Sequence, residues 1–291
     1  MRRIGLGLTC LVAAIAIVAI PHLAQEVPAG PALNRTVQGP ATAPTYSDVY
    51  CAGFVTARQV PNDTYLITGE ESANKIVFAD RDFVYLNKGS AEGVGIGQEF
   101  SIVRAVRDAT KLPWFKYQRG LSAAMGTVYA DLGRVKVVIV HERTSTAEVV
   151  FSCTPMNRGD LALPFEPRPI PPFKSPAAFD RFAPKSGKYD AMIVLARDFQ
   201  QGVGTGSVVY VNAGSNQGVK VGEYFRFFRY ATKDTYKSEG FGAAPKAYSW
   251  KDVPREVLGE GIVLHTEENS SSVLITTSLR ELFLGEYAEL E

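Results

Sequence analysis

The chain has 291 residues, a formal net charge of +1, 46% hydrophobic residues and 21% charged residues. This composition is that of an ordinary globular protein, and it excludes a strongly basic nucleic-acid-binding face and a long acidic tail. The length allows one or two domains of ordinary size.

An export signal is predicted at the N-terminus. Two arginines precede an apolar run from Ile4 to Ile20, and the small residue Ala24 follows as a cleavage position. The run holds about 17 residues, at the lower edge for a spanning helix, so we favour cleavage over a retained membrane anchor. We therefore predict a signal peptide at 1–24 and a flexible tether, rich in Pro, Gly, Ala and Thr, at 25–47. Membrane contact is expected only through an uncleaved signal.

Two cysteines, Cys51 and Cys153, remain after the predicted cleavage. An exported protein meets an oxidising compartment, where an even pair of cysteines tends to form a disulfide. The alternative is a pair of buried free thiols. A bridge would close a loop of about 100 residues and stabilise the fold by roughly 4–5 kcal/mol on the chain-entropy account.

Two similar stretches indicate an internal repeat. "VYLNKGSAEGVGIGQEFSIVR" begins at Val84 and "VYVNAGSNQGVKVGEYFRFFR" begins at Val209, an offset of 125 residues. The similarity continues further on at an offset of 126, where Leu132-Gly133 meets Leu258-Gly259. One net insertion over about 80 residues indicates a duplicated domain rather than chance similarity.

Each copy contains short stretches of β-branched and aromatic residues, such as "GRVKVVIV" and "SSVLITT", separated by Gly, Asn and Ser. This pattern predicts an all-β fold with two tandem small barrels. We assign the first barrel, with an added N-terminal β segment (Asp48–Glu71) that has no clear counterpart in the second copy, to 48–163. A proline-rich linker follows at 164–188, and the second barrel occupies 189–291.

The glycines of the repeated stretch could suggest a phosphate-binding loop. However, the order strand, Gly-rich loop, strand lacks the helix N-terminus that presents amides to a phosphate. We interpret the motif as a barrel corner, in which Val94 and Val219 point inward and Ile96 and Val221 supply the next apolar contact. The structural turn residues, chosen because Asn and Gly tolerate tight turns, are Asn87, Gly89, Gly93, Gly97, Asn212, Gly214, Gly218 and Gly222.

The pattern D-x-V-Y-L-N-x-G-x-x-x-G-V-x-x-G-x-x-F-x-I-x-R resembles the C-terminal barrel domain of flagellar assembly protein T. It is also similar to a barrel module of bacterial envelope proteins that often carry a LysM peptidoglycan-binding module. The resemblance covers roughly Asp82–Leu163 and Ser207–Glu291. It implies SH3-like barrels and a structural or binding role without catalytic residues. The chain departs from those relatives because no LysM-like segment precedes Ser47.

The sequence offers little for catalysis or for a metal. His141 and His265 end comparable strands in different copies, and neither has a Cys or His neighbour, so we interpret them as surface histidines. Carboxylates such as Asp82 and Glu267 flank strands and turns, and we interpret them as solvated charges rather than the paired acids of a glycosidase. We predict no catalytic residue, no metal site and no cofactor.

The strongest binding signal is aromatic. Each copy has one long excursion between its central strands, at Asp108–Gly126 and Thr232–Glu256. Loops on a rigid barrel often bind ligands, and aromatic side chains suit a protein partner or a sugar. The alternative is that each tryptophan folds back to plug its own barrel end. The candidate partner- or glycan-binding residues are Trp114, Phe115, Tyr117, Tyr248 and Trp250.

We therefore predict a non-enzymatic, exported protein of the bacterial periplasm or cell envelope, whose tandem barrels act as a scaffold or adaptor. Its expected partners are envelope proteins or an envelope assembly, and no nucleic acid. The alternative is a peptidoglycan or carbohydrate binder that uses Trp114 and Trp250. A third possibility is a hydrolase with an unrecognised site.

Overall fold

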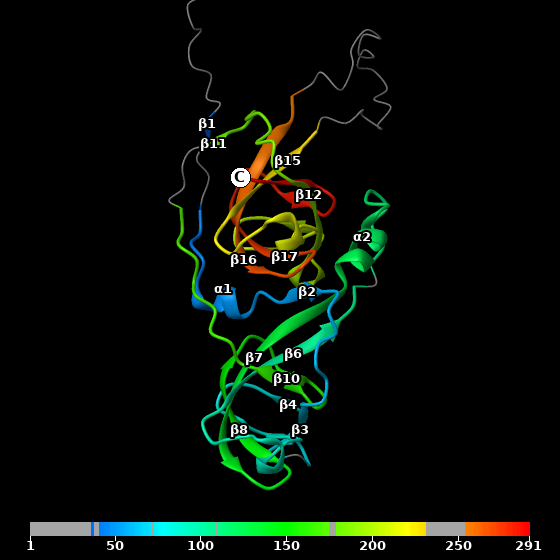
Figure 1. Ribbon diagram of the computed structural model, residues 1–291. Coiled ribbons are helices and arrows are strands. Elements are labelled where there is room, and N and C mark those ends of the chain that lie inside the picture. The colour runs from blue at the N-terminus through cyan, green and yellow to red at the C-terminus, as the bar shows by residue number, and fades with distance from the viewer. Residues whose placement is uncertain (1–35, 38–40, 72, 109, 175–178, 231–253) are drawn as a thin grey trace, which may run out of the picture. The chain divides into compact units, whose positions relative to one another are not determined.

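The computed structural model of the protein describes residues 36–37, 41–71, 73–108, 110–174, 179–230 and 254–291 (Figure 1). These residues belong to one compact unit. They contain two α-helices, α1 (Tyr46–Tyr50) and α2 (Gln118–Met125), and are otherwise built mainly from strands, which confirms the expected all-β class. None of the helices in these ranges is long and apolar enough to cross a membrane. The predicted signal peptide lies outside them.

The second copy forms a closed antiparallel barrel of six strands. In pairing order these are β12 (Asp190–Ala196), β14 (Val208–Val211), β17 (Ser271–Ser278), β16 (Glu256–Thr266), β15 (Tyr224–Arg229) and β19 (Tyr287–Leu290). The pairing of β19 with β12 closes the barrel. Apolar side chains such as Phe225 and Phe227 fill its core. A separate ribbon pairs β13 (Gly202–Val203) with β18 (Leu282–Phe283).

The first copy forms a sheet with a similar path. Its strands in pairing order are β10 (Leu161–Pro164), β6 (Glu99–Val106), β7 (Thr127–Val140), β8 (Ser145–Ser152), β5 (Phe83–Leu86) and β3 (Leu66–Gly69), and β2 (Phe54–Thr56) pairs with β7. β3 and β10 meet at an isolated bridge between Tyr65 and Leu161. Two further ribbons pair β4 (Val77–Phe78) with β9 (Met156–Asn157), and β1 (Thr36–Val37) with β11 (Phe179–Asp180).

The two strand orders correspond position by position, from β3 and β12 at one end to β10 and β19 at the other. The pairing register follows the repeat as well, since Ile102 pairs with Gly133 and Phe227 pairs with Gly259. The segment Asp48–Glu71 was expected to be an added β segment without a counterpart. It contains the end of α1 and the whole of β2, but it also contains β3, which takes the place that β12 takes in the second barrel.

The repeated glycine motif forms a corner that holds a short 3₁₀ turn, at Ser90–Glu92 in the first copy and Ser215–Gln217 in the second. The glycine that ends each turn has a left-handed backbone, with φ of 83° at Gly93 and 81° at Gly218, where a side chain would be strained. The last glycine of each motif, Gly97 or Gly222, has a positive φ as well.

The first glycine of each motif is needed for a different reason. Gly89 and Gly214 are extended, but a Cβ there would lie 2.2 Å from the carbonyl oxygen of His141 or Glu267. The asparagines do not use positive φ either. The Oδ1 atoms of Asn87 and Asn212 instead accept hydrogen bonds from backbone amides that precede β3 and lie in β12. The corner is therefore fixed by close backbone approach and by side-chain hydrogen bonds as well as by turn conformation.

The apolar residues of the motif divide in two. Val94 and Val219 are buried in the cores of their own copies, as expected. Ile96 and Val221 are 76% and 46% exposed, so the expectation that they add the next core contact is wrong. They lie between the two left-handed glycines, where the turn points the side chain to solvent.

The predicted disulfide is confirmed. Cys51 and Cys153 are joined, with 5.6 Å between their Cα atoms. Cys51 directly follows α1, whose N-terminus is capped by Thr45 and Asp48, and Cys153 directly follows β8. The bridge therefore holds the end of α1 against the first sheet.

Candidate functional site

The first excursion, Asp108–Gly126, packs on the second barrel. Phe115 is buried in the apolar core of that barrel, and its ring would lie 3.0 Å from a Cβ placed on Gly285. The indole Nε1 of Trp114 donates a hydrogen bond of 3.2 Å to the carbonyl oxygen of Leu284. The alternative in which Trp114 plugs its own barrel is therefore wrong. The first copy instead inserts Phe115 into its neighbour.

A hollow of about 690 Å³ lies where the excursion meets the second barrel. We call it the aromatic hollow. Its walls are formed by Trp114, Phe115, Lys116 and Tyr117 from the excursion and by Met192, Arg229, Tyr230, Phe283, Leu284, Gly285, Glu286 and Tyr287 from the second barrel. Three of the five candidate binding residues of the sequence analysis are thus brought together here. The other two, Tyr248 and Trp250, lie outside the described residues.

The aromatic rings of the hollow are held in place by their neighbours, and several of them are exposed to solvent. Trp114 is 57% exposed and Tyr117 is 78% exposed. On the barrel side, Tyr287 stacks on Phe228 with ring centroids 5.5 Å apart and meets the edge of Tyr230 at 5.2 Å. Ring pairs of this kind fix one another, so the wall presents aromatic faces with little freedom to collapse.

An ion pair between the partly exposed Arg229 and the buried Glu286 borders the aromatic hollow. The guanidinium of Arg229 donates from Nε and Nη2 to Oε1 of Glu286, with Nε at 2.8 Å. Burial raises the pKa of Glu286, and Arg229 opposes that rise. The other carboxylate oxygen of Glu286, Oε2, has no hydrogen-bond partner within the described part of the chain. Because Arg229 and Glu286 compensate each other, the remaining charge of the lining is the ammonium of Lys116.

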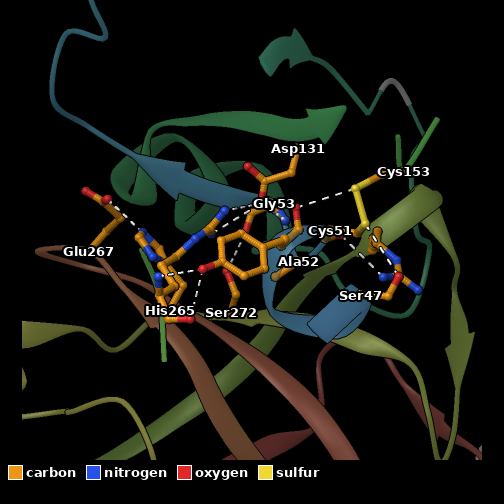
Figure 2. A network of polar contacts seen from close by, with 12 residues as sticks. Ser47, Cys51, Ala52, Gly53, Asp131, Cys153, His265, Glu267 and Ser272 are labelled. Atoms are coloured by element: carbon orange, nitrogen blue, oxygen red, sulfur yellow. Dashed lines mark hydrogen bonds and ion pairs between the residues drawn. A yellow bond between two sulfur atoms is a disulfide. The ribbon is translucent and has the colours of Figure 1, made fainter. Parts of the chain in front are cut away.

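A second polar cluster joins the two copies. We call residues 51–58 the strap, because this segment contacts both copies. One edge of its strand, β2, pairs with β7 of the first sheet. The other edge receives hydroxyl donors from the second barrel (Figure 2). Tyr210 Oη donates to the carbonyl of Ala52 at 2.9 Å, and Ser272 Oγ donates to that of Gly53 at 2.7 Å. The disulfide at Cys51 thus anchors to the first sheet a segment that the second barrel also binds.

Glu267, from the second copy, contacts the C-terminal end of the strap. It is buried, so its assignment as a solvated charge is wrong. It accepts hydrogen bonds from Thr56 Oγ1 at 2.8 Å and from Arg58 Nη2 at 2.5 Å, and His265 Nε2 lies 3.0 Å away. Burial alone would raise the pKa of Glu267, but these donors outweigh it and lower the pKa to about 2. The carboxylate therefore stays ionised between the copies.

Asp131 is the second buried acid of this cluster (Figure 2). It accepts from the backbone N–H of Gly53 at 3.0 Å and from Arg168 at 3.3 Å. Burial raises its pKa, and the charge of Arg168 opposes the rise. Arg168 belongs to the predicted linker, and its backbone N–H also donates to Tyr50 Oη at 2.8 Å. The proline-rich segment therefore packs against α1 and β7 here.

The two histidines differ. His141 is exposed, whereas His265 is partly buried beside the ring of Phe54, 5.6 Å away, and faces Glu267. Within the ranges that the structure describes, no group of three or more His, Cys, Asp or Glu residues could hold a metal ion. No local sequence pattern indicates this cluster, because its members come from segments about 80 to 200 residues apart.

No protein-family model matches the chain, and neither does any curated protein.

Proposed function

We propose that the chain is an exported, non-enzymatic envelope protein that acts as a scaffold or adaptor through two SH3-like barrels in tandem. The shared strand order of the two copies supports the tandem arrangement, with 48–163 and 189–291 as its domains and 164–188 as the linker. The disulfide between Cys51 and Cys153 supports export to an oxidising compartment such as the periplasm, because cytosolic thiols are kept reduced.

The observation that carries the binding role is the aromatic hollow. Its lining is rich in Tyr, Trp, Phe, Met and Arg, the residue types enriched at the centres of protein interfaces. Trp114 and Tyr117 leave most of their surface in water. A contiguous aromatic surface that none of the described residues covers is typical of a site that a partner covers. A protein partner in the envelope is therefore the function that this geometry supports best.

Photo-cross-linking in intact envelopes tests this proposal. A photo-reactive amino acid placed at Tyr117 in the full chain should give a protein adduct of defined mass. The matched control is the same amino acid at Ile96, which is 76% exposed and lies on the corner of the first copy. A lack of protein adducts at 117, or the same adducts from both positions, would contradict the proposal.

The second candidate is a peptidoglycan or carbohydrate binder. It is favoured by one specific observation, the presence of aromatic faces beside the polar edge of Arg229 and Glu286, because sugars stack on rings and donate hydrogen bonds to carboxylates. Sedimentation with purified cell wall tests it. Retention that Trp114→Ala abolishes would favour this candidate, and passage of the wild-type chain into the supernatant would remove it.

A further inference from the structure

The charge balance around the aromatic hollow is positive. Arg229 is compensated by Glu286, and Lys185, whose ammonium lies 5.8 Å from the centre of the Tyr230 ring, is paired with Asp190 at 2.5 Å. Lys116 has no ion-pair partner among the described residues. Within the described part of the chain, the hollow therefore carries one positive charge beside its rings that no acid compensates.

The excursion that forms one wall has the same sign. Between Asp108 and Gly126 it carries three basic residues, Lys111, Lys116 and Arg119, against the single acid Asp108, a balance of +2. The whole chain carries only +1, so this short segment is distinctly more basic than the rest. Of these basic residues Lys116 lines the hollow, and a basic segment attracts acidic partners over distances of about one Debye length, roughly 8–10 Å, and selects against basic ones.

Arg229 is well placed to bind a second carboxylate. Its Nε and Nη2 both point to one oxygen of Glu286, so the guanidinium plane is held in one orientation. Nη1 has no acceptor among the described residues, and the side chain is partly exposed. A guanidinium that is already oriented loses less rotamer entropy on binding, which favours recognition of an incoming carboxylate.

We propose that the occupant of the aromatic hollow is an acidic segment of a partner protein. An apolar side chain of that segment packs between Trp114, Tyr117 and Tyr287, and a neighbouring carboxylate binds Lys116 and Nη1 of Arg229. Polypeptide fits better than glycan, because Met192, Phe283 and Leu284 add purely apolar side chains to the lining, which leave sugar hydroxyls without partners. This inference rests on the proposed adaptor function and adds the chemistry of the partner.

Peptide binding to the purified full chain provides the first test. The probes are three labelled peptides: Phe-Leu flanked by Asp and Glu, the same core flanked by Lys, and Ala-Ala flanked by Asp and Glu. The acidic Phe-Leu peptide should bind at least about fivefold more tightly than either of the others, because rim charges and a buried apolar side chain each contribute on the order of a kcal/mol. The advantage over the Lys-flanked peptide should shrink in about 0.5 M salt.

Substitution of Lys116 sharpens this test. Lys116→Glu should reverse the preference between acid-flanked and Lys-flanked peptides, whereas the conservative Lys116→Arg should keep it. Equal binding of the two Phe-Leu peptides, an unchanged preference in Lys116→Glu, or no binding of the acidic peptide would each overturn the inference.

Cross-linking separates this inference from the proposed function. With the photo-reactive amino acid at Tyr117, the protein adduct should map to an acidic segment and should be lost with Lys116→Glu. A protein adduct that survives Lys116→Glu, or that maps to a basic segment, overturns the acidic partner and leaves the adaptor function standing. A glycan adduct, or no adduct with the wild-type lysine, overturns both.

Discussion

The two copies share one strand order and close in different ways. In the second barrel, β19 pairs with β12 through three residue pairs, from Asp190 and Glu289 to Met192 and Tyr287, so the ladder is continuous. In the first sheet, Tyr65, just before β3, forms one bridge with Leu161 of β10, and backbone hydrogen bonds join Thr64 and Leu66 to the segment 159–162. The first sheet also carries an extra strand, β2, which pairs with β7, and the disulfide between Cys51 and Cys153. One repeated sequence therefore gives a barrel closed by a three-pair ladder and a sheet whose two ends meet at a single bridge.

The dependence runs in both directions. The first copy places Phe115 in the core of the second barrel, and the second barrel supplies the hydroxyls of Tyr210 and Ser272 to the strap. Each copy is therefore stabilised by a group that the other copy contributes. This exchange suggests that the difference between the copies can be measured by removing one contribution at a time.

Removing the disulfide should have the largest effect. Cys51→Ser combined with Cys153→Ser should lower the free energy of unfolding by roughly 4–5 kcal/mol, because the bridge closes a long loop. Urea denaturation measures this loss. Amide hydrogen exchange should rise more in the first sheet than in the second barrel, and an equal rise in both would contradict the asymmetry in closure.

Phe115→Ala should come next, with a loss of about 3–5 kcal/mol as a large ring leaves a packed core. The amides that lose protection from hydrogen exchange should belong to the second barrel, although Phe115 belongs to the first copy. Tyr117→Ala is the control, because that side chain is 78% exposed and should change stability by about 0.5 kcal/mol or less. Loosening of the first sheet alone would show that the docking of the excursion is misplaced.

The contact of Glu267 with the strap should make the free energy of unfolding depend on pH. The pKa of Glu267 is about 2 in the folded chain and about 4.5 in its ordinary state, so its ionised form favours folding. This contribution, about 3 kcal/mol, should be complete above pH 4.5 and lost as the pH falls through about 2. The free-energy difference between wild type and Glu267→Gln should shrink over that window, and a constant difference would contradict the assignment.

The glycine corners should show the smallest effect and the closest agreement between copies. Gly93→Ala and Gly218→Ala should each cost about 1–2 kcal/mol, because a side chain with positive φ is strained although space for it is free. Gly95→Ala is the control, since its φ is not positive and a Cβ there meets nothing within 4 Å. Unequal costs at Gly93 and Gly218, measured by chemical denaturation, would show that the corners are not equivalent.

Sequence reasoning predicted the features that are encoded locally or repeated. The offsets of 125 and 126 reappear in the strand register, for example where Phe227 pairs with Gly259, and the two cysteines formed the predicted bridge. Helix α1 was missed because five residues carry no measurable periodicity, although Thr45 and Asp48 have the spacing of a capping box.

Contacts between the copies could not be predicted in this way. Glu267 appears in the sequence as an acid in a turn, and only the strap, about 210 residues away in the chain, buries it. Phe115 appears as one of several aromatic residues in a loop, and nothing in its neighbours indicates that its destination is the other core. Long-range burial depends on how elements meet, which a single sequence does not reveal without a related structure.

The serine hydroxyls that meet the strap also bear on solubility. An uncovered strand edge is a template on which a second chain can add a strand, and such additions lead to aggregation. The outward carbonyls of Gly53, just before β2, and of Val55 on β2 instead accept hydrogen bonds from Ser272 and Ser270. Side-chain donors satisfy that edge without continuing the sheet, so the two copies adhere while their sheets stay separate and the edge offers no template to other chains.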